Sequence, residues 1–136
     1  MCSTSQLAGS LTGQNGTAGG VASSLVLTNK GSHACTLYGY PGVSYVAANG
    51  STVGAPAVRS PRTVQTVTLA PGAAAEAPLL ETNPYNYPQP GCRLTRYASL
   101  RIYPPGQRAS LLVAHGGQTC ANPADNVLQV GPMAAG

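Results

Sequence analysis

Charged side chains are scarce in this sequence, and phenylalanine and tryptophan are absent. Only 7% of the residues are charged, against about 25% in an average domain, whereas 43% are hydrophobic. Because disordered chains combine low hydrophobicity with high net charge, this composition excludes an intrinsically disordered protein. The length of 136 residues corresponds to one domain and excludes a large multidomain enzyme.

Long apolar runs and helical periodicity are also missing. The longest apolar run is far shorter than the roughly 18 residues of a membrane span, so we predict no transmembrane segment. No stretch places apolar residues at positions i, i+3, i+4 and i+7 without an interrupting glycine or proline. The sequence therefore predicts no α-helix longer than two turns.

Short runs rich in Val, Leu, Thr and Tyr alternate instead with Gly, Pro and Asn clusters, a pattern typical of an all-β sandwich or barrel. We predict one antiparallel β-sandwich over residues 1–136, with a frayed tail from Pro132. Gly13–Gly20 is interpreted as a flexible hairpin loop and Thr82–Gly91 as a long surface loop. The predicted strands are Gln6–Thr12, Val21–Thr28, Thr36–Tyr38, Val43–Ala47, Ala57–Arg59, Val64–Leu69, Ala75–Leu80, Ala98–Tyr103, Ala109–Ala114 and Val127–Val130.

The Pro104–Gln107 turn predicts a hairpin of the strands on either side of it, in which Tyr103 faces Arg108. That register pairs Ile102 with Ala109, Leu100 with Leu111 and Ala98 with Val113. These six apolar side chains form one buried face. We expect Arg101, Tyr103 and Arg108 to be exposed on the other face as the most basic patch, with weak affinity for acidic wall polymers.

The four cysteines, Cys2, Cys35, Cys92 and Cys120, include no C-x-x-C pair, which structural zinc sites usually have. An even set favours disulfides, and disulfides persist in oxidising compartments, so we expect a secreted or envelope-anchored protein. We predict the pairs Cys2–Cys35 and Cys92–Cys120, because each pair brackets a predicted hairpin. In the alternative, Cys2 is the lipidated first residue of a lipoprotein. The initial methionine is interpreted as a start codon added to a trimmed mature sequence.

Residues for catalysis or metal binding are few. His33 and His115 are the only histidines, and Glu76, Glu81 and Asp125 the only carboxylates. Hydrolases need a nucleophile, a base and a group that orients the base, and no Gly-x-Ser-x-Gly or phosphate-binding glycine motif is present. We expect these residues in turns or on solvated surface, and assign no catalytic residue, cofactor or metal. A triad assembled from distant loops and a weak two-histidine metal site stay open as alternatives.

The net charge of +4 suits an anionic partner, but lysine and arginine form no run. Nucleic-acid binders concentrate these residues along a helix or stripe, so we expect no nucleic-acid partner. The abundance of Gly, Pro and Ala, and of Arg over Lys, indicates a GC-rich coding bias such as that of actinobacteria.

Several segments together resemble a known family. The matching segments are Leu25–Gly31, Cys35–Ser44, Thr68–Gly72, Leu100–Gly106 and Leu128–Pro132. They resemble an actinobacterial secreted domain of unknown function, family 4232. The resemblance covers nearly the whole chain and implies an immunoglobulin-like β-sandwich outside the cell or tethered to its envelope. It implies no activity and supplies no binding residue.

Tyrosine is the one enriched residue suited to binding, because it gives a large contact area at low entropic cost. We predict that Tyr38 and Tyr45 are structural, and that Tyr40, Tyr85 and Tyr87 are exposed. The candidate binding surface is Tyr40, Tyr85, Tyr87, Arg101, Tyr103 and Arg108. The favoured function is a non-catalytic envelope module that binds an unknown protein or an envelope glycan. The alternative is a secreted protease inhibitor that presents the loop of residues 82–92, and an enzyme ranks third.

Overall fold

The computed structural model describes residues 1–136 and is built almost entirely of strands. The strands are β1 (Leu7–Thr17), β2 (Gly20–Asn29), β3 (Cys35–Tyr38), β4 (Gly42–Val46), β5 (Thr52–Val53), β6 (Val58–Arg59), β7 (Thr66–Leu69), β8 (Ala74–Thr82), β9 (Leu94–Tyr103), β10 (Leu111–Cys120), β11 (Leu128–Val130) and β12 (Ala134–Ala135). The only helices are two 3-10 turns, η1 (Thr4–Gln6) and η2 (Pro84–Asn86), and neither could cross a membrane. The predicted all-β fold without a long α-helix is confirmed.

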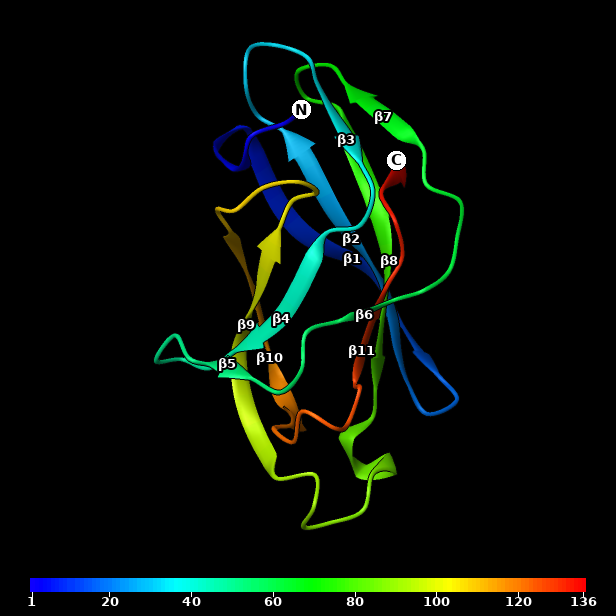
Figure 1. Cartoon of the computed structure of the whole chain (residues 1–136), viewed down its shortest axis with the longest axis vertical. Coiled ribbons are helices and arrows are strands. Elements are labelled where there is room, and N and C mark those ends of the chain that lie inside the picture. Colours follow the sequence, from blue (N-terminus) through cyan, green and yellow to red (C-terminus); the bar gives the residue numbers. More distant parts are fainter.

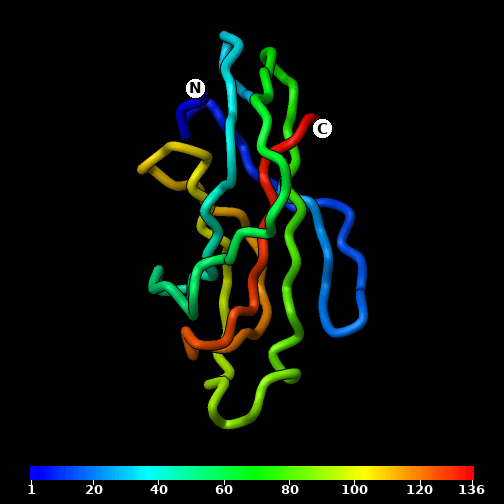
Figure 2. The backbone as a smooth tube through the Cα atoms, turned by 45° about the vertical axis from the view of Figure 1, so that its right-hand side comes forward, coloured from blue at the N-terminus to red at the C-terminus, as the bar shows by residue number.

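Two sheets pack against each other as a sandwich (Figure 1). The larger has the order β1-β2-β8-β11-β6, with β12 also paired to β8, and the smaller has the order β10-β9-β4-β5. A separate β3–β7 pair lies at the end where both termini are found, as Figures 1 and 2 show. All pairs are antiparallel except β11–β6. In both views the far part of the β1–β2 hairpin projects away from the body.

The core comes from the alternating residues of the central strands, since a strand directs successive side chains to opposite faces. Leu25 and Leu27 of β2 are fully buried, as are Leu100 and Ile102 of β9. Burying each such side chain contributes about 1.5–3 kcal/mol. The core is therefore stabilised by leucine, isoleucine and valine, in the absence of phenylalanine and tryptophan. The C-terminal tail joins this core instead of fraying, because Met133 is fully buried and β12 pairs with β8.

The β9–β10 hairpin forms, but its predicted register is wrong by two residues. Leu111 pairs with Ile102 and Val113 with Leu100, so the loop spans residues 104–110. The loop is longer than a tight turn, and Pro104 and Pro105 at its start are buried and have no N–H to donate to the ladder. Because side chains alternate with a period of two, a shift of two residues leaves each side chain on the same face of the hairpin. Leu100, Ile102 and Val113 are therefore buried as predicted and Leu111 is half-buried, whereas Ala98 and Ala109 are exposed.

Both predicted disulfides are confirmed. Cys2 is bonded to Cys35 and Cys92 to Cys120, with Cα separations of 4.8 and 4.7 Å. The Cys2 sulfur that the lipoprotein alternative requires is thus occupied by the bond to Cys35. Loops of this length give a disulfide a stabilisation of about 3–4 kcal/mol in the chain-entropy model.

Candidate functional site

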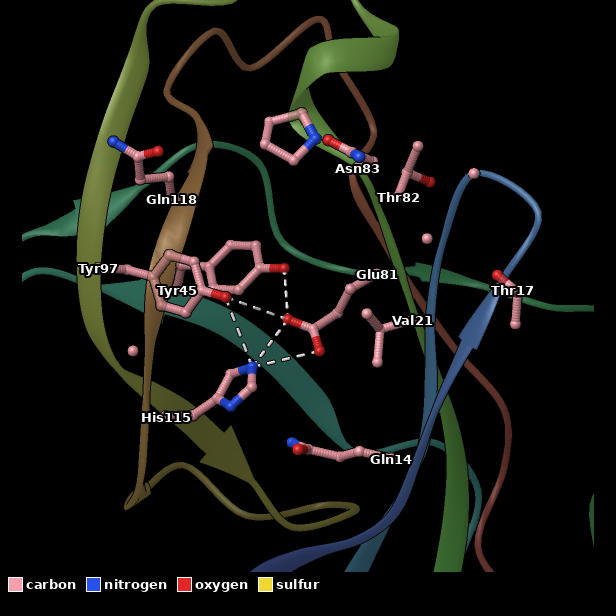
Figure 3. Close-up of a pocket in the computed structure, with 14 residues that line it drawn as sticks. Gln14, Thr17, Val21, Tyr45, Glu81, Thr82, Asn83, Tyr97, His115 and Gln118 are labelled. Carbon is pink, nitrogen blue, oxygen red and sulfur yellow. Dashed lines mark hydrogen bonds and ion pairs between the residues drawn. The ribbon is translucent and has the colours of Figure 1, made fainter.

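The site lies where β1 of the larger sheet diverges from β10 of the smaller one (Figure 1). Near Gly9 the two strands are in contact, and a Cβ added there would come within 2.7 Å of the Leu111 side chain. Further along, the β1–β2 hairpin turns outward and leaves a pocket of about 420 Å³ (Figure 3). Its lining is mostly polar and consists of Gln14, Thr17, Gly19, Gly20, Val21, Tyr45, Glu81, Thr82, Asn83, Pro84, Tyr97, His115, Gly116 and Gln118. We call it the Glu81 pocket.

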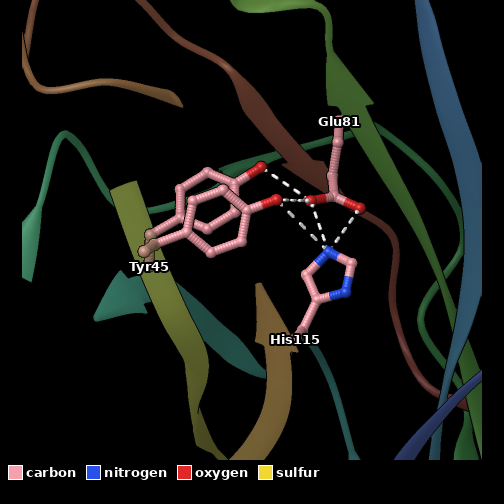
Figure 4. A network of polar contacts seen from close by, with 4 residues as sticks. Tyr45, Glu81 and His115 are labelled. Atoms are coloured by element: carbon pink, nitrogen blue, oxygen red, sulfur yellow. Dashed lines mark hydrogen bonds and ion pairs between the residues drawn. The ribbon is translucent and has the colours of Figure 1, made fainter. Parts of the chain in front are cut away.

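Four side chains from four strands meet in one wall of this pocket (Figure 4). The Glu81 carboxylate of β8 is 3.0 and 3.2 Å from Nε2 of His115 on β10. The hydroxyl of Tyr45 on β4 donates to Glu81 Oε1 at 2.7 Å, and that of Tyr97 on β9 donates to the same oxygen at 3.4 Å. The two tyrosine rings are stacked with centroids 4.1 Å apart. The cluster therefore joins both sheets across the sandwich.

Tyr97 enters the cluster beside a β-bulge whose extra residue lies on β10. Ser99 pairs with Ala114 and Tyr97 with Gly117, so Ala98 alone faces His115 and Gly116. In a regular strand Tyr97 and Leu100, an odd number of residues apart, would point to opposite faces, but here both point inward. A Cβ at Gly117 would lie 2.7 Å from the Tyr97 hydroxyl, so glycine there makes room for the phenol.

A second bulge lies on β1, at the opposite side of the pocket. Thr12 pairs with Ser24 and Asn15 with Ala22, so Gly13 and Gln14 face the single residue Ser23. Gly13 has a φ of 62°, a conformation that favours glycine. The bulge places Gln14 in the pocket lining. Gly13–Gly20, predicted to be a flexible loop, is therefore mostly strand, with a turn at Ala18 and Gly19.

The cluster holds an ion pair. Burial alone would raise the pKa of Glu81, but the hydrogen bonds from His115 and Tyr45 outweigh it and lower this pKa below the ordinary 4.5. The hydrogen bond to Glu81 raises the pKa of His115 above 6.5. Burial and the neighbouring carboxylate raise the pKa values of Tyr45 and Tyr97, so both phenols stay protonated. The pKa shifts of Glu81 and His115 favour the charged forms, a carboxylate facing an imidazolium between two phenol donors.

The expectation that Glu81 and His115 are surface or turn residues is wrong. The side chains of His115 and Glu81 are only 16% and 9% exposed. Their positions did carry a signal, because Glu81 continues the alternation of the buried Ala77 and Leu79, and His115 that of Val113. The predicted strands ended just before Glu81 and His115, whereas β8 continues to Thr82 and β10 to Cys120.

None of the tyrosines predicted for the binding surface is among the residues that line this pocket, although the Tyr85 hydroxyl donates to the lining residue Gln118 at 3.3 Å, and they differ in burial. Tyr85 is exposed as expected, at 64%. Tyr40 and Tyr87 are half-buried instead, because each packs against the core and donates a hydrogen bond to a backbone carbonyl, of Ser60 and Asn126 respectively. Of the two tyrosines predicted to be structural, Tyr45 is buried, whereas Tyr38 is 64% exposed.

The predicted basic face is only partly assembled. Arg101 lies on β9 but its guanidinium donates to Thr52 and to the carbonyl of Gly50, which ties it to the turn between β4 and β5. Tyr103 is 38% exposed. Arg108 is exposed in the loop of residues 104–110, outside the strand in which it was predicted to face Tyr103.

One further cluster has the composition of a metal site. Cys92, Cys120 and Asp125 bring their ligand atoms within 4.8 Å of one another. Both sulfurs are consumed by the disulfide and supply no thiolate, so this cluster lacks the ligands of a zinc centre.

The comparison with protein families identifies the domain. A family model described as a domain of unknown function, DUF4232, matches residues 2–134. The chain belongs to this family. No curated protein and no solved structure matches the sequence. The family has no assigned activity, so function is inferred from the Glu81 pocket.

Proposed function

We propose that this DUF4232 domain is a non-catalytic binding module of the cell envelope that receives its ligand in the Glu81 pocket. The observation that carries the proposal is the largely buried ion pair of Glu81 and His115 in the wall of an open, polar pocket. Desolvating an ion pair offsets much of its Coulombic gain, so such a pair is a costly way to stabilise a fold. Titratable groups with perturbed pKa values in a cleft are typical of functional sites.

The hydrogen-bonding pattern supports binding over catalysis. His115 contacts only the Glu81 carboxylate and the Tyr97 hydroxyl, and no serine, threonine or cysteine donates to it. The raised pKa of Tyr97 keeps its hydroxyl protonated and therefore a poor nucleophile. A paired histidine with no nucleophile donating to it suits the orientation of a ligand better than covalent attack on one.

The disulfides and the sequence support a location in the cell envelope. Two disulfides suit an oxidising compartment outside the cytoplasm. The GC-rich coding bias and the motifs of the chain favour a secreted actinobacterial domain, with an immunoglobulin-like arrangement of its sandwich.

The protease-inhibitor alternative depends on the segment of residues 82–92. Its end is fixed by the Cys92–Cys120 bond and Tyr85 is exposed on it, which favours a presented loop. The segment nevertheless contains the 3-10 turn η2 and is held to the body through Tyr87. We therefore favour the pocket, and a panel of serine and cysteine proteases tests the alternative directly.

The proposal is tested by blocking the pocket. Val21 lines it and is 37% exposed, whereas Val58 lies on β6 outside it and is 41% exposed. We expect Val21→Arg to reduce co-sedimentation of the purified domain with isolated actinobacterial cell walls at least tenfold, and Val58→Arg to leave it unchanged. Equal binding by the two variants would refute the pocket as the ligand site.

A further inference from the structure

We infer that the Glu81 pocket selects a neutral oligosaccharide. This inference rests on the proposed function and names the chemical class of its ligand. It follows from the charge of the pocket, from its hydrogen-bonding groups, from its continuation along the strands and from the bulges at its edges.

The pocket is electrically balanced although the chain carries a net charge of +4. None of the seven lysine and arginine residues lines it, and its one carboxylate, Glu81, is neutralised by His115. A phosphate or carboxylate ligand would therefore lose its hydration in a pocket whose one cationic group, His115, is already paired with Glu81, which is unfavourable. A ligand without charge avoids this cost.

The free polar groups match hydroxyls. The side chains of Gln14, Thr17 and Thr82 line the pocket and make no hydrogen bond within the protein. Amides and hydroxyls both donate and accept, as sugar hydroxyls do. Nδ1 of His115 is likewise unpartnered, because the contacts to Glu81 use Nε2 only. Val21 and the ring of Tyr97 add an apolar surface suited to the C–H face of a sugar ring.

The space extends beyond one sugar unit. A second hollow of about 420 Å³ runs between β1 and β10, lined by residues 9–14 and 113–115. It shares Gln14 and His115 with the Glu81 pocket, so the two hollows adjoin at these side chains. Each is within the size of a small-ligand pocket, about 300–1,000 Å³. Adjoining hollows accommodate successive rings of one chain.

A polar groove between two strand edges also suits an extended peptide, which binds by adding to one edge as a further strand. The edges of this groove, however, are irregular. β1 and β10 are the free edges of their sheets, and each carries a bulge beside the pocket, at Gly13–Gln14 and at His115–Gly116. Strand addition requires a regular ladder of backbone groups, which a bulge interrupts. The edges therefore favour recognition by side chains.

The inference is tested by competition. Oligosaccharides released enzymatically from the cell walls are separated by anion exchange into neutral and acidic fractions, and wall peptides form a third fraction. We expect only the neutral fraction to displace the labelled domain from walls. Periodate, which cleaves vicinal diols, should abolish the displacement. Displacement by the acidic or the peptide fraction, or by none of the three, would overturn the inference.

A matched pair of variants assigns the contact. Gln14→Ala removes an exposed amide that makes no hydrogen bond within the protein, and one lost ligand hydrogen bond corresponds to an affinity about fivefold lower. Gln65→Ala, at an exposed position outside the pocket, should leave the affinity for the neutral fraction unchanged. If the two variants behave alike, the sugar does not occupy the junction. Loss of wall binding in Val21→Arg together with failed sugar competition would refute the ligand class but not the pocket.

Discussion

His115→Ala leaves the Glu81 carboxylate largely buried without its cationic partner. Glu81 would keep the hydrogen bonds from Tyr45 and Tyr97, so its negative charge is partly, not wholly, uncompensated. Breaking a fully buried pair costs about 3–5 kcal/mol, and losing a hydrogen bond to a charged group about 1.5–3 kcal/mol. Because His115 is 16% exposed, we expect a loss of about 2–3 kcal/mol in the free energy of unfolding.

A double-mutant cycle separates the ion pair from ordinary packing. In the Glu81→Gln background the neutral amide needs no cation, so His115→Ala should cost only about 1 kcal/mol there. The assay is urea unfolding of the oxidised protein followed by circular dichroism, with the free energy taken from the midpoint and slope. A coupling energy below about 0.5 kcal/mol would refute the assignment of a functional ion pair, since independent sites add within that range.

The same coupling depends on pH in a defined direction. Because the pKa of His115 is raised in the folded protein, its contribution to the free energy of unfolding is complete below pH 6.5 and is lost as the pH rises through the raised value. Because the pKa of Glu81 is lowered, its contribution to the free energy of unfolding is complete above pH 4.5 and is lost as the pH falls through the lowered value. The coupling should therefore be largest between pH 4.5 and 6.5 and decline on both sides. A coupling that is unchanged at alkaline pH would contradict this account.

Two further predictions concern the framework of the site. Gly117→Ala should destabilise the domain by about 1–3 kcal/mol, because the added Cβ would lie 2.7 Å from the Tyr97 hydroxyl. The control, Gly116→Ala, has its nearest contact at 3.6 Å and should cost less than about 1 kcal/mol in the same unfolding assay. Replacing both Cys92 and Cys120 with serine should cost about 3–4 kcal/mol and lower the thermal midpoint, and a midpoint equal to that of the parent would contradict the stabilisation assigned to this bond.

Alternation and turn residues were sufficient to predict most strands, and the cysteine positions to predict both disulfides. Alternation works where a strand has one buried face, as in β2, because each apolar residue there reports its own orientation. It fails at a bulge, where an extra residue shifts the phase of the bulged strand. Glycine lies in both bulges, as Gly13 and Gly116, but glycine is equally typical of a turn. Tyr97 points inward although alternation from Leu100 predicts the opposite face, and Gly13–Gly20 lacks large side chains that would reveal a strand.

The Glu81 cluster was beyond prediction for a related reason. Its four members come from β4, β8, β9 and β10, and their proximity depends on how the two sheets face each other. Sequence periodicity describes one strand at a time and carries no information on that packing. Only the extension of the buried alternation to Glu81 and His115 indicated that these polar side chains point inward.

The neutrality of the pocket and the positive charge of the chain lead to separate salt dependences. A net charge of +4 attracts the domain to anionic walls over a distance of about 8 Å at physiological salt and 3 Å at 1 M. Arg108 and the partly buried Arg101 are part of this charge, so Arg101→Ala with Arg108→Ala should weaken wall binding at low salt. A neutral oligosaccharide in a balanced pocket releases no counterions. Its affinity, measured by calorimetry, should therefore be unchanged by that double substitution and by salt up to 1 M, and a steep salt dependence would show that charge, not the Glu81 pocket, dominates recognition.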